Sequence, residues 1–268
     1  MKKLQLIPTL LFMVFHTCLS GQSEKAAKRG QNNTVVFYFV RHGKTILNTM
    51  DRVQGWADAP LTPEGIKGAR NLAKGLRSEK INFKSAYSSD LGRARQTARL
   101  VLDSKGRQDL TVHEVADLRE TNFGSYEGGE NTKMWTDAAL YLHYKSSAEL
   151  FEALKTKHET IENVLAAFKA LDTLGIAEDY AKVKSRGQSA IREIAQKEQK
   201  NGGGNILVVG HGMALGIFLS DLDSSGKKAA GGAMANTAVS KVTYKDGQFT
   251  LETFGDVSYL QKGEQMAD

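Results

Sequence analysis

The sequence is poor in cysteine, and this limits the chemistry that it can use. Its single cysteine, Cys18, lies in an N-terminal segment that we expect to be removed, so the mature chain would have neither disulfide nor thiol chemistry. No zinc-finger spacing and no basic patch interleaved with aromatic residues is present, which argues against a nucleic-acid partner. The pattern Gly-x-x-x-x-Gly-Lys-Ser/Thr is also missing, so no phosphate-binding loop of that type is expected.

One short apolar run at the N-terminus indicates a secretory signal. The rest of the sequence has no long apolar run. Two lysines precede the apolar segment 6–15, and small residues stand at positions −3 and −1 of a cleavage point before Gly21. This apolar segment is too short for a comfortable membrane span, and no later stretch approaches the required length. We therefore expect residues 1–20 to be a signal peptide and the protein to be exported to the periplasm, cell surface or exterior, without membrane contact after cleavage.

The segment around the cleavage point carries two further predictions. Lipoprotein anchoring at Cys18 is disfavoured, because His16 and Thr17 are poor residues before a lipidated cysteine. The polar spacer 21–33 lacks apolar periodicity and is predicted to be a flexible leader. Signal removal takes away two of the 36 lysines and arginines and none of the 30 acids, which leaves a net charge of +4 that suits an anionic substrate.

The rest of the composition is that of an ordinary globular protein, with 41% hydrophobic and 25% charged residues. We expect one domain over residues 34–260. Residues 129–200 have apolar positions at helical spacing and little glycine or proline, which predicts a helical insertion over the active site. The tail 261–268 is polar and is predicted to be loose, and the oligomeric state stays open.

Two short apolar runs are each followed by a histidine flanked by glycine. Val35 to Val40 leads into Arg41-His42-Gly43, and Ile206 to Val209 leads into Gly210-His211-Gly212. Such runs are typical of strands buried on both faces of a parallel sheet. If these strands are parallel and adjacent, both histidines reach one sheet edge, where open α/β sheets bind ligands. A helix over 213–219 would direct free backbone N–H groups to the same point and favour an anion.

Two histidines and arginines at one sheet edge provide what phosphoryl transfer through a phosphohistidine needs. A lone histidine after a strand is more often a hydrogen-bonded structural residue, and it is the repeated glycine-flanked context that favours function. No metal or other cofactor is implied, because arginines stand where metal ligands would be needed.

At Arg41-His42-Gly43 and Gly210-His211-Gly212 the sequence resembles the histidine phosphatase superfamily, the phosphoglycerate-mutase-like proteins, over most of residues 35–245. The resemblance implies an α/β three-layer sandwich, with a mainly parallel central sheet, helices on both faces and a helical insertion. It makes His42 the nucleophile. Lys44 is a departure, because the family usually has an acid there; it either adds positive potential at the pocket mouth or faces solvent.

The resemblance also assigns residues to the substrate phosphate. The family's phosphate pocket is lined by the asparagine that matches Asn48 and by the loop that begins Gln54-Gly55. We interpret Trp56 in that loop as a hydrophobic plug. The complete predicted phosphate-binding set is Arg41, Asn48, Gln54, Gly55, Arg93, His211, Gly212 and Met213.

Two arginines compete for one role on a predicted helix that Ser88 or Ser89 would cap. Arg93 and Arg95 point roughly 160° apart at 100° per residue, so only one should reach the pocket. The helical period leaves both open, with Arg95 nearer the apolar side. The family pattern Ser-x-Leu-x-Arg-Ala-x-x-Thr-Ala, which begins here at Ser89, implies Arg93.

A carboxyl group is needed to protonate the departing alkoxide and then to take a proton from water. The segment around Glu120 resembles the family's Leu-Arg-Glu, followed by Gly-x-aromatic-Glu-Gly, and this resemblance makes Glu120 the proton donor. Glu114 and Glu127 are interpreted as structural carboxylates, since a solvated carboxylate is the default for any one glutamate. The substrate-selecting residues should lie in the insertion, where Lys133, Tyr141, His143 and Lys145 are unranked candidates.

Taken together, the sequence predicts an exported, metal-independent phosphomonoesterase that acts on a small phosphorylated substrate. Its catalytic residues would be His42, Glu120, Arg41, Arg93 and His211. A phosphoglycerate-mutase-type phosphotransferase is the first alternative. The export signal and the lack of Arg-Arg and proline-rich stretches after Glu120 disfavour it, although the 91 positions from Glu120 to His211 match mutases. A non-catalytic protein that binds a phosphate ligand is the second alternative.

Overall fold

The computed structural model describes residues 33–223 and 234–266. The predicted signal peptide, Cys18 and nearly all of the predicted leader lie outside the described residues. Within the described residues, no helix has both the length and the apolar character needed to cross a membrane.

The described residues contain one six-stranded sheet in the order β3-β2-β4-β1-β5-β6. The strands are β1 (Val35–Arg41), β2 (Phe83–Ser88), β3 (Val112–Glu114), β4 (Gly204–Gly210), β5 (Val239–Lys245) and β6 (Gln248–Asp256). The first four of these are parallel, and β5 and β6 continue the sheet as antiparallel strands beside β1. The prediction of a mainly parallel sheet is confirmed.

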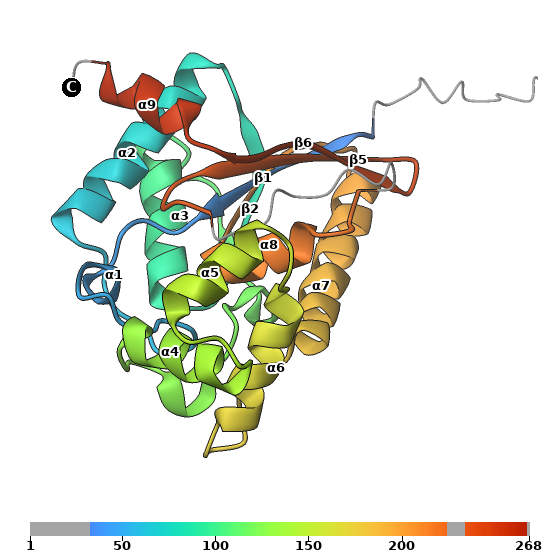
Figure 1. The fold of residues 1–268 in the computed structure, drawn as a ribbon. Coiled ribbons are helices and arrows are strands. Elements are labelled where there is room, and N and C mark those ends of the chain that lie inside the picture. Colours follow the sequence, from blue (N-terminus) through green and yellow to red (C-terminus); the bar gives the residue numbers. More distant parts are fainter. Residues whose placement is uncertain (1–32, 224–233, 267–268) are drawn as a thin grey trace, which may run out of the picture. The chain divides into compact units, whose positions relative to one another are not determined.

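Helices cover both faces of this sheet (Figure 1). They are α1 (Ile46–Thr49), α2 (Pro63–Ser78), α3 (Gly92–Ser104), α4 (Asn131–Tyr141), α5 (Ser147–Lys155), α6 (Ile161–Leu171), α7 (Tyr180–Lys200), α8 (Gly212–Leu219) and α9 (Ser258–Glu264), with short 3₁₀ turns at Ala116–Leu118 and Gly124–Tyr126. Alternate residues of β1 point to opposite sides. Phe37 and Phe39 enter the core shared with α7 and α8, whereas Tyr38 and Val40 enter the core shared with α2 and α3. The three-layer arrangement is thereby confirmed.

The register of β1 against β4 positions the site. These parallel neighbours pair Val40 with Val209 and Arg41 with Gly210, so both strands end at the same level. The His42 N–H then donates to the Gly210 carbonyl at 3.0 Å. Both histidines therefore leave the sheet at one edge, as the two apolar runs predict.

The helix starts were predicted with unequal success. Threonine followed by proline is a typical helix start, and Thr62 caps α2 by accepting from the Gly65 N–H at 3.0 Å, with Pro63 at the first helical position. The predicted serine cap of α3 is wrong. Ser89 Oγ accepts from the N–H of Leu91, which precedes the helix. The N–H groups of Gly92 and Arg93, in the first turn, donate to the carboxylate of Asp58 instead.

Two predicted segment boundaries need correction. The segment 129–200 is largely helical, but its last helix, α7, packs on the sheet through buried residues such as Ile191 and forms part of a layer. The insertion proper is α4 to α6, which meet through Trp135 and Phe168. The tail is not loose from residue 261, because α9 continues to Glu264 and lies against α2.

Candidate active site

His42 lies at the end of β1 with a single possible arrangement of its ring proton. Its Nδ1 lies 2.8 Å from the Gly43 carbonyl, which can only accept, so Nδ1 carries the hydrogen. Nε2 lies 3.2 Å from Arg93 Nε, which can only donate, so Nε2 holds the lone pair. The ring is therefore fixed with its nucleophilic nitrogen toward an arginine.

Arg93 is buried and is held by several acceptors at once. Its Nη1 donates to the Ala57 carbonyl at 3.0 Å and to Asp58 Oδ1 at 2.9 Å, and its Nη2 donates to the Gly55 carbonyl at 2.8 Å. Arg95 instead pairs with Glu114 on the exposed side of α3. The structure thus places Arg93, and not Arg95, against His42.

His211 and Arg41 complete a cluster of cationic and imidazole groups. The ring centroids of His42 and His211 are 5.2 Å apart. Both nitrogens of His211, and Nε of Arg41, are buried without a hydrogen-bond partner among the described residues. A side chain at Gly212 would begin 3.1 Å from Arg41 Nε, so the glycine allows this arginine to approach the start of α8. Such an arrangement suits a group that brings several acceptor oxygens, as a phosphoryl group does.

Burial and positive neighbours determine the protonation of both histidines. Desolvation, followed by the charges of Arg93 and Arg41, holds the pKa of His42 well below its usual value. Desolvation and Arg93, with smaller effects of His42 and Arg41, lower the pKa of His211 in the same way. Both rings are therefore neutral at pH 7, and His42 Nε2 does not have to lose a proton to a base before it can attack.

Glu120 lies at the N-terminus of α8. Its Oε1 accepts from the N–H groups of Ala214 at 2.7 Å and Thr121 at 2.9 Å, and its Oε2 accepts from that of Met213 at 3.1 Å. The helix N-terminus favours a negative charge here. The Met213 N–H, which the sequence analysis assigned to the substrate phosphate, donates to Glu120 in this structure, so a phosphate oxygen would have to replace Glu120 there.

A buried ion pair holds the backbone that carries Glu120. Arg186 donates to the carbonyls of Asp117, Arg119 and Glu120 at 2.8 to 2.9 Å. Glu178 pairs with Arg186 at 2.7 Å. No sequence pattern marks this pair, because both residues lie in polar stretches with no motif, 58 or more positions after Glu120.

The comparisons agree with this geometry. The family model described as histidine phosphatase superfamily (branch 1) matches residues 37–257. This chain belongs to the histidine phosphatase superfamily. It is 30% identical to a metal-independent phosphoserine phosphatase of Arabidopsis thaliana over 82% of this chain and 81% of that protein. It is 29% identical to a broad-specificity phosphatase of Saccharomyces cerevisiae over 87% and 90%, respectively.

Solved structures give the same assignment. A crystal structure of a phosphoglycerate mutase from Bacillus anthracis superposes with a TM-score of 0.80 at 40% identity, covering 88% of this chain and 99% of that one. Membership of the superfamily, together with relatives named as phosphatases, identifies the chain as an enzyme of the phosphatase type.

The remaining predicted phosphate ligands of this histidine phosphatase lie around the loop after β1. Gln54 Oε1 accepts from Thr45 at 2.6 Å, while its Nε2 is buried with no partner among the described residues. Asn48 Oδ1 accepts from Asn236, whose Nδ2 also donates to the His42 carbonyl at 3.0 Å. Asn236 therefore links the turn before β5 to the backbone of the predicted nucleophile.

Trp56 is not the plug that the sequence predicted. Its side chain is 39% exposed, its Nε1 donates to the Glu120 carbonyl at 3.0 Å, and its ring lies 4.6 Å from the guanidinium carbon of Arg119. The residue therefore forms part of a polar and aromatic surface beside Glu120.

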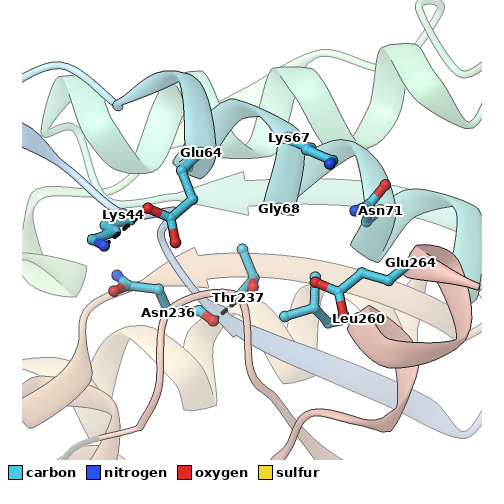
Figure 2. Close-up of a pocket in the computed structure, with 10 residues that line it drawn as sticks. Lys44, Glu64, Lys67, Gly68, Asn71, Asn236, Thr237, Leu260 and Glu264 are labelled. Carbon is cyan, nitrogen blue, oxygen red and sulfur yellow. Dashed lines mark hydrogen bonds and ion pairs between the residues drawn. The ribbon is translucent and has the colours of Figure 1, made fainter.

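Lys44 lines a separate pocket of 440 Å³ between α2, α9 and the turn before β5 (Figure 2). Its ammonium pairs with Glu64 at 2.9 Å, and Asn236 and Thr237 lie across from that pair. The lysine that departs from the family pattern is thus engaged with Glu64 at this pocket.

The insertion candidates are all at the surface. Lys133 pairs with Asp137 within α4, and Tyr141, His143 and Lys145 are exposed. Their part in substrate selection stays a prediction. Across the described part of the chain, no group of three or more His, Cys, Asp or Glu side chains is arranged to hold a metal ion.

Proposed function

We propose that this histidine phosphatase is an exported, metal-independent phosphomonoesterase that works through a phosphohistidine on His42. The observation that carries the proposal is the state of the His42 ring, which is neutral, with its Nδ1 hydrogen bonded to the Gly43 carbonyl and the Nε2 lone pair facing Arg93. A second neutral imidazole, His211, and the cation of Arg41 complete the surroundings of an in-line phosphoryl transfer.

The reaction has two steps. In the first, the Nε2 lone pair attacks phosphorus and the ester P–O bond breaks. A phosphate oxygen takes the Met213 N–H from Glu120 Oε2, which then carries the proton gained from water in the preceding turnover and gives it to the departing oxygen. In the second, the Glu120 carboxylate takes a proton from water, the water oxygen attacks phosphorus, and the P–N bond breaks. Inorganic phosphate leaves, and the electron pair of the broken P–N bond returns to Nε2.

Fixed cations replace a metal ion in this proposal. Arg41 Nε has no hydrogen-bond partner among the described residues and can donate to an equatorial oxygen, on which negative charge is spread during transfer. Arg93 Nε, which donates to His42 Nε2 before the reaction, would exchange that lone pair for an equatorial oxygen as the lone pair attacks phosphorus. The substrate would be a small phosphomonoester, as the names of the phosphoserine and broad-specificity relatives suggest. Export rests on the signal pattern of residues 1–20.

Release of inorganic phosphate from p-nitrophenyl phosphate tests the proposal. We expect wild-type enzyme to turn over equally with and without a chelator, because no step uses a metal. His42→Ala should lose at least ~1,000-fold in kcat, because the covalent step disappears. Absence of release by the wild type contradicts the phosphatase activity, full activity of His42→Ala contradicts the phosphohistidine route, and loss of turnover with a chelator contradicts metal independence.

A phosphoglycerate-mutase-type transfer is the second candidate, favoured by the 40% identity to the Bacillus anthracis structure of that name. Both reactions share the first step and differ in the acceptor of the phosphoryl group. Exchange of label between phosphoglycerates without release of inorganic phosphate would identify the mutase. Release in excess of exchange would identify the phosphatase.

A further inference from the structure

Glu127, which the sequence analysis took for an ordinary structural carboxylate, collects four backbone hydrogen bonds. Its two oxygens accept from the N–H groups of Gly55, Trp56, Ala57 and Phe123 at 2.8 to 3.1 Å. Three of these belong to the loop 55–57, whose other side faces Arg93. One side chain therefore gathers the N–H groups of the loop that holds the catalytic arginine.

Two peptide units of this loop stand between Glu127 and Arg93. In the unit that joins Gln54 to Gly55, the N–H donates to Glu127 at 3.1 Å and the carbonyl accepts from Arg93 Nη2 at 3.4 Å. In the next unit, the N–H of Trp56 donates at 2.9 Å and the carbonyl of Gly55 accepts at 2.8 Å. Each amide dipole thus has its positive end toward the carboxylate and its negative end toward the guanidinium.

The charges at the two ends reinforce one another. A carboxylate polarises and orients an amide that it accepts from, and an oriented carbonyl binds a cation more strongly. Burial lowers the pKa of Arg93, while the negative charges of Asp58, Glu120 and Glu127 oppose that shift. Asp58 contacts Arg93 directly. Glu127 instead binds the amides of the loop whose carbonyls hold Arg93, so it acts on the arginine through the loop.

Packing leaves little freedom in this arrangement. A Cβ on Gly55 would lie 2.2 Å from Glu127 Oε1 and 2.2 Å from the Thr121 carbonyl. The carboxylate is therefore pressed directly onto the Gly55 backbone, and no other residue type fits between them. Gly55, predicted as a phosphate ligand, is required here for this close approach.

We propose that Glu127 is a positioning residue, which sets the Arg93 guanidinium on His42 Nε2 by way of the loop 54–57. The inference rests on the proposed function, since it concerns how that site is arranged for phosphoryl transfer. Glu127 itself touches no reacting atom. If the inference holds, its effect reaches the substrate through Arg93 and not through Gln54 or Gly55, the predicted phosphate ligands of the same loop.

The test compares Glu127→Gln with Glu114→Gln, a matched loss of charge at the exposed partner of Arg95. A glutamine has one acceptor oxygen and places an N–H₂ group against two donor N–H groups, so the loop should shift. We expect Glu127→Gln to raise KM for p-nitrophenyl phosphate and the inhibition constant of inorganic phosphate about 10-fold and to lower kcat. Glu114→Gln should match the wild type.

A purely structural role predicts a different pattern. If Glu127 only stabilised the fold, the variant would contain less active enzyme, with lower kcat but unchanged KM and phosphate inhibition. A double-mutant cycle with Arg93→Ala measured by calorimetry of phosphate binding adds a second criterion. In the Arg93→Ala background, Glu127→Gln should have no further effect on phosphate affinity, whereas additive losses would overturn the inference.

Two further outcomes separate this inference from the proposed function. If wild-type enzyme binds phosphate without turnover, the proposed function fails, and the binding cycle still decides the role of Glu127. If Glu127→Gln does not fold, Glu127→Asp takes its place. That variant keeps the charge but moves it back by one methylene, and phosphate affinity equal to the wild type would then refute the positioning role.

Discussion

Arg93 and Arg95 show how differently two residues of one helix turn can be used. Arg93 is almost completely buried, touches His42 and is bound by carbonyls of a distant loop, whereas Arg95 is half exposed and pairs with Glu114. A buried, hydrogen-bonded guanidinium next to a nucleophile should contribute far more to catalysis than an arginine in an exposed ion pair, which has little energetic effect.

The two arginines therefore form a matched pair of variants. Arg93→Ala should lower kcat/KM about 100-fold or more, because it removes a charged donor to the transferring phosphoryl group. Arg95→Ala should stay within about twofold of the wild type. Steady-state hydrolysis of p-nitrophenyl phosphate measures both. Equal losses in the two variants would show that net charge, and not position, is what the helix supplies.

The structure brings most of the predicted site residues together, but the sequence does not show how they are held. His42 and His211 could be predicted because each stands one residue after the end of an apolar run and is followed by glycine. Arg93 and Arg95 could not be separated by helical period, because the choice depends on carbonyls of residues 54–57, nearly 40 positions away. Glu127 was set aside for the same reason, since its partners are backbone atoms that no side-chain pattern reveals.

At the scale of elements, the contact between α2 and α9 is unusually close. A Cβ on Gly75 of α2 would lie 1.8 Å from the Tyr259 carbonyl, and a Cβ on Gly263 of α9 would lie 1.8 Å from the Asn71 carbonyl. Glycines on each helix thus let the two backbones touch. This is why the chain stays helical beyond Gln261, where its polar sequence alone predicts a loose tail.

Two glycines of α2 provide a test of that contact. Gly75→Ala should lower the free energy of unfolding by about 3 kcal/mol, because the added methyl group forces α9 away from α2. Gly68→Ala meets nothing closer than 3.7 Å and should be neutral or stabilise by up to about 1 kcal/mol through helix propensity. Urea unfolding of both variants gives the comparison. A stable Gly75→Ala protein would mean that α9 is not held there.

The positions of helices and strands could be predicted where the sequence signal is local. A helix cap could not be predicted where the capping residue lies far away in the sequence. Apolar runs mark β1 and β4, and the adjacent pair Thr62-Pro63 marks the start of α2. The cap of α3 is a carboxylate, Asp58, from 34 positions earlier in the chain, so inspection of the preceding serines could not find it. The sequence likewise does not show that α7 packs on the sheet, because its apolar face would look the same in an insertion.

For the molecule as a whole, the two buried histidines make stability depend on pH. Both have a pKa well below 6.5 when folded and near 6.5 when unfolded. Below pH 6.5 the unfolded chain binds protons that the folded protein does not, so the free energy of unfolding falls as the pH falls. Each histidine should contribute a loss of about 1.4 kcal/mol between pH 7.5 and pH 5.5.

Replacing one of the pair tests this linkage. His211→Gln keeps a polar side chain of similar size but removes one titrating group. Between pH 7.5 and 5.5 the variant should lose about 1.4 kcal/mol less stability than the wild type, measured by urea unfolding at both values. Parallel pH dependences for the two proteins would show that His211 does not stay neutral in the fold.

The place of β4 in the sheet has a consequence for synthesis of the protein. His42, both site arginines and Glu120 leave the ribosome first, while β4, which separates β1 from β2, is made more than 100 residues after β2. A nascent chain that lacks β4 cannot bring β1 and β2 to their final spacing, and it has no second imidazole. The site can therefore form only after β4 has been made and has entered the sheet between β1 and β2, and a chain that ends before β4 should be inert toward phosphate esters.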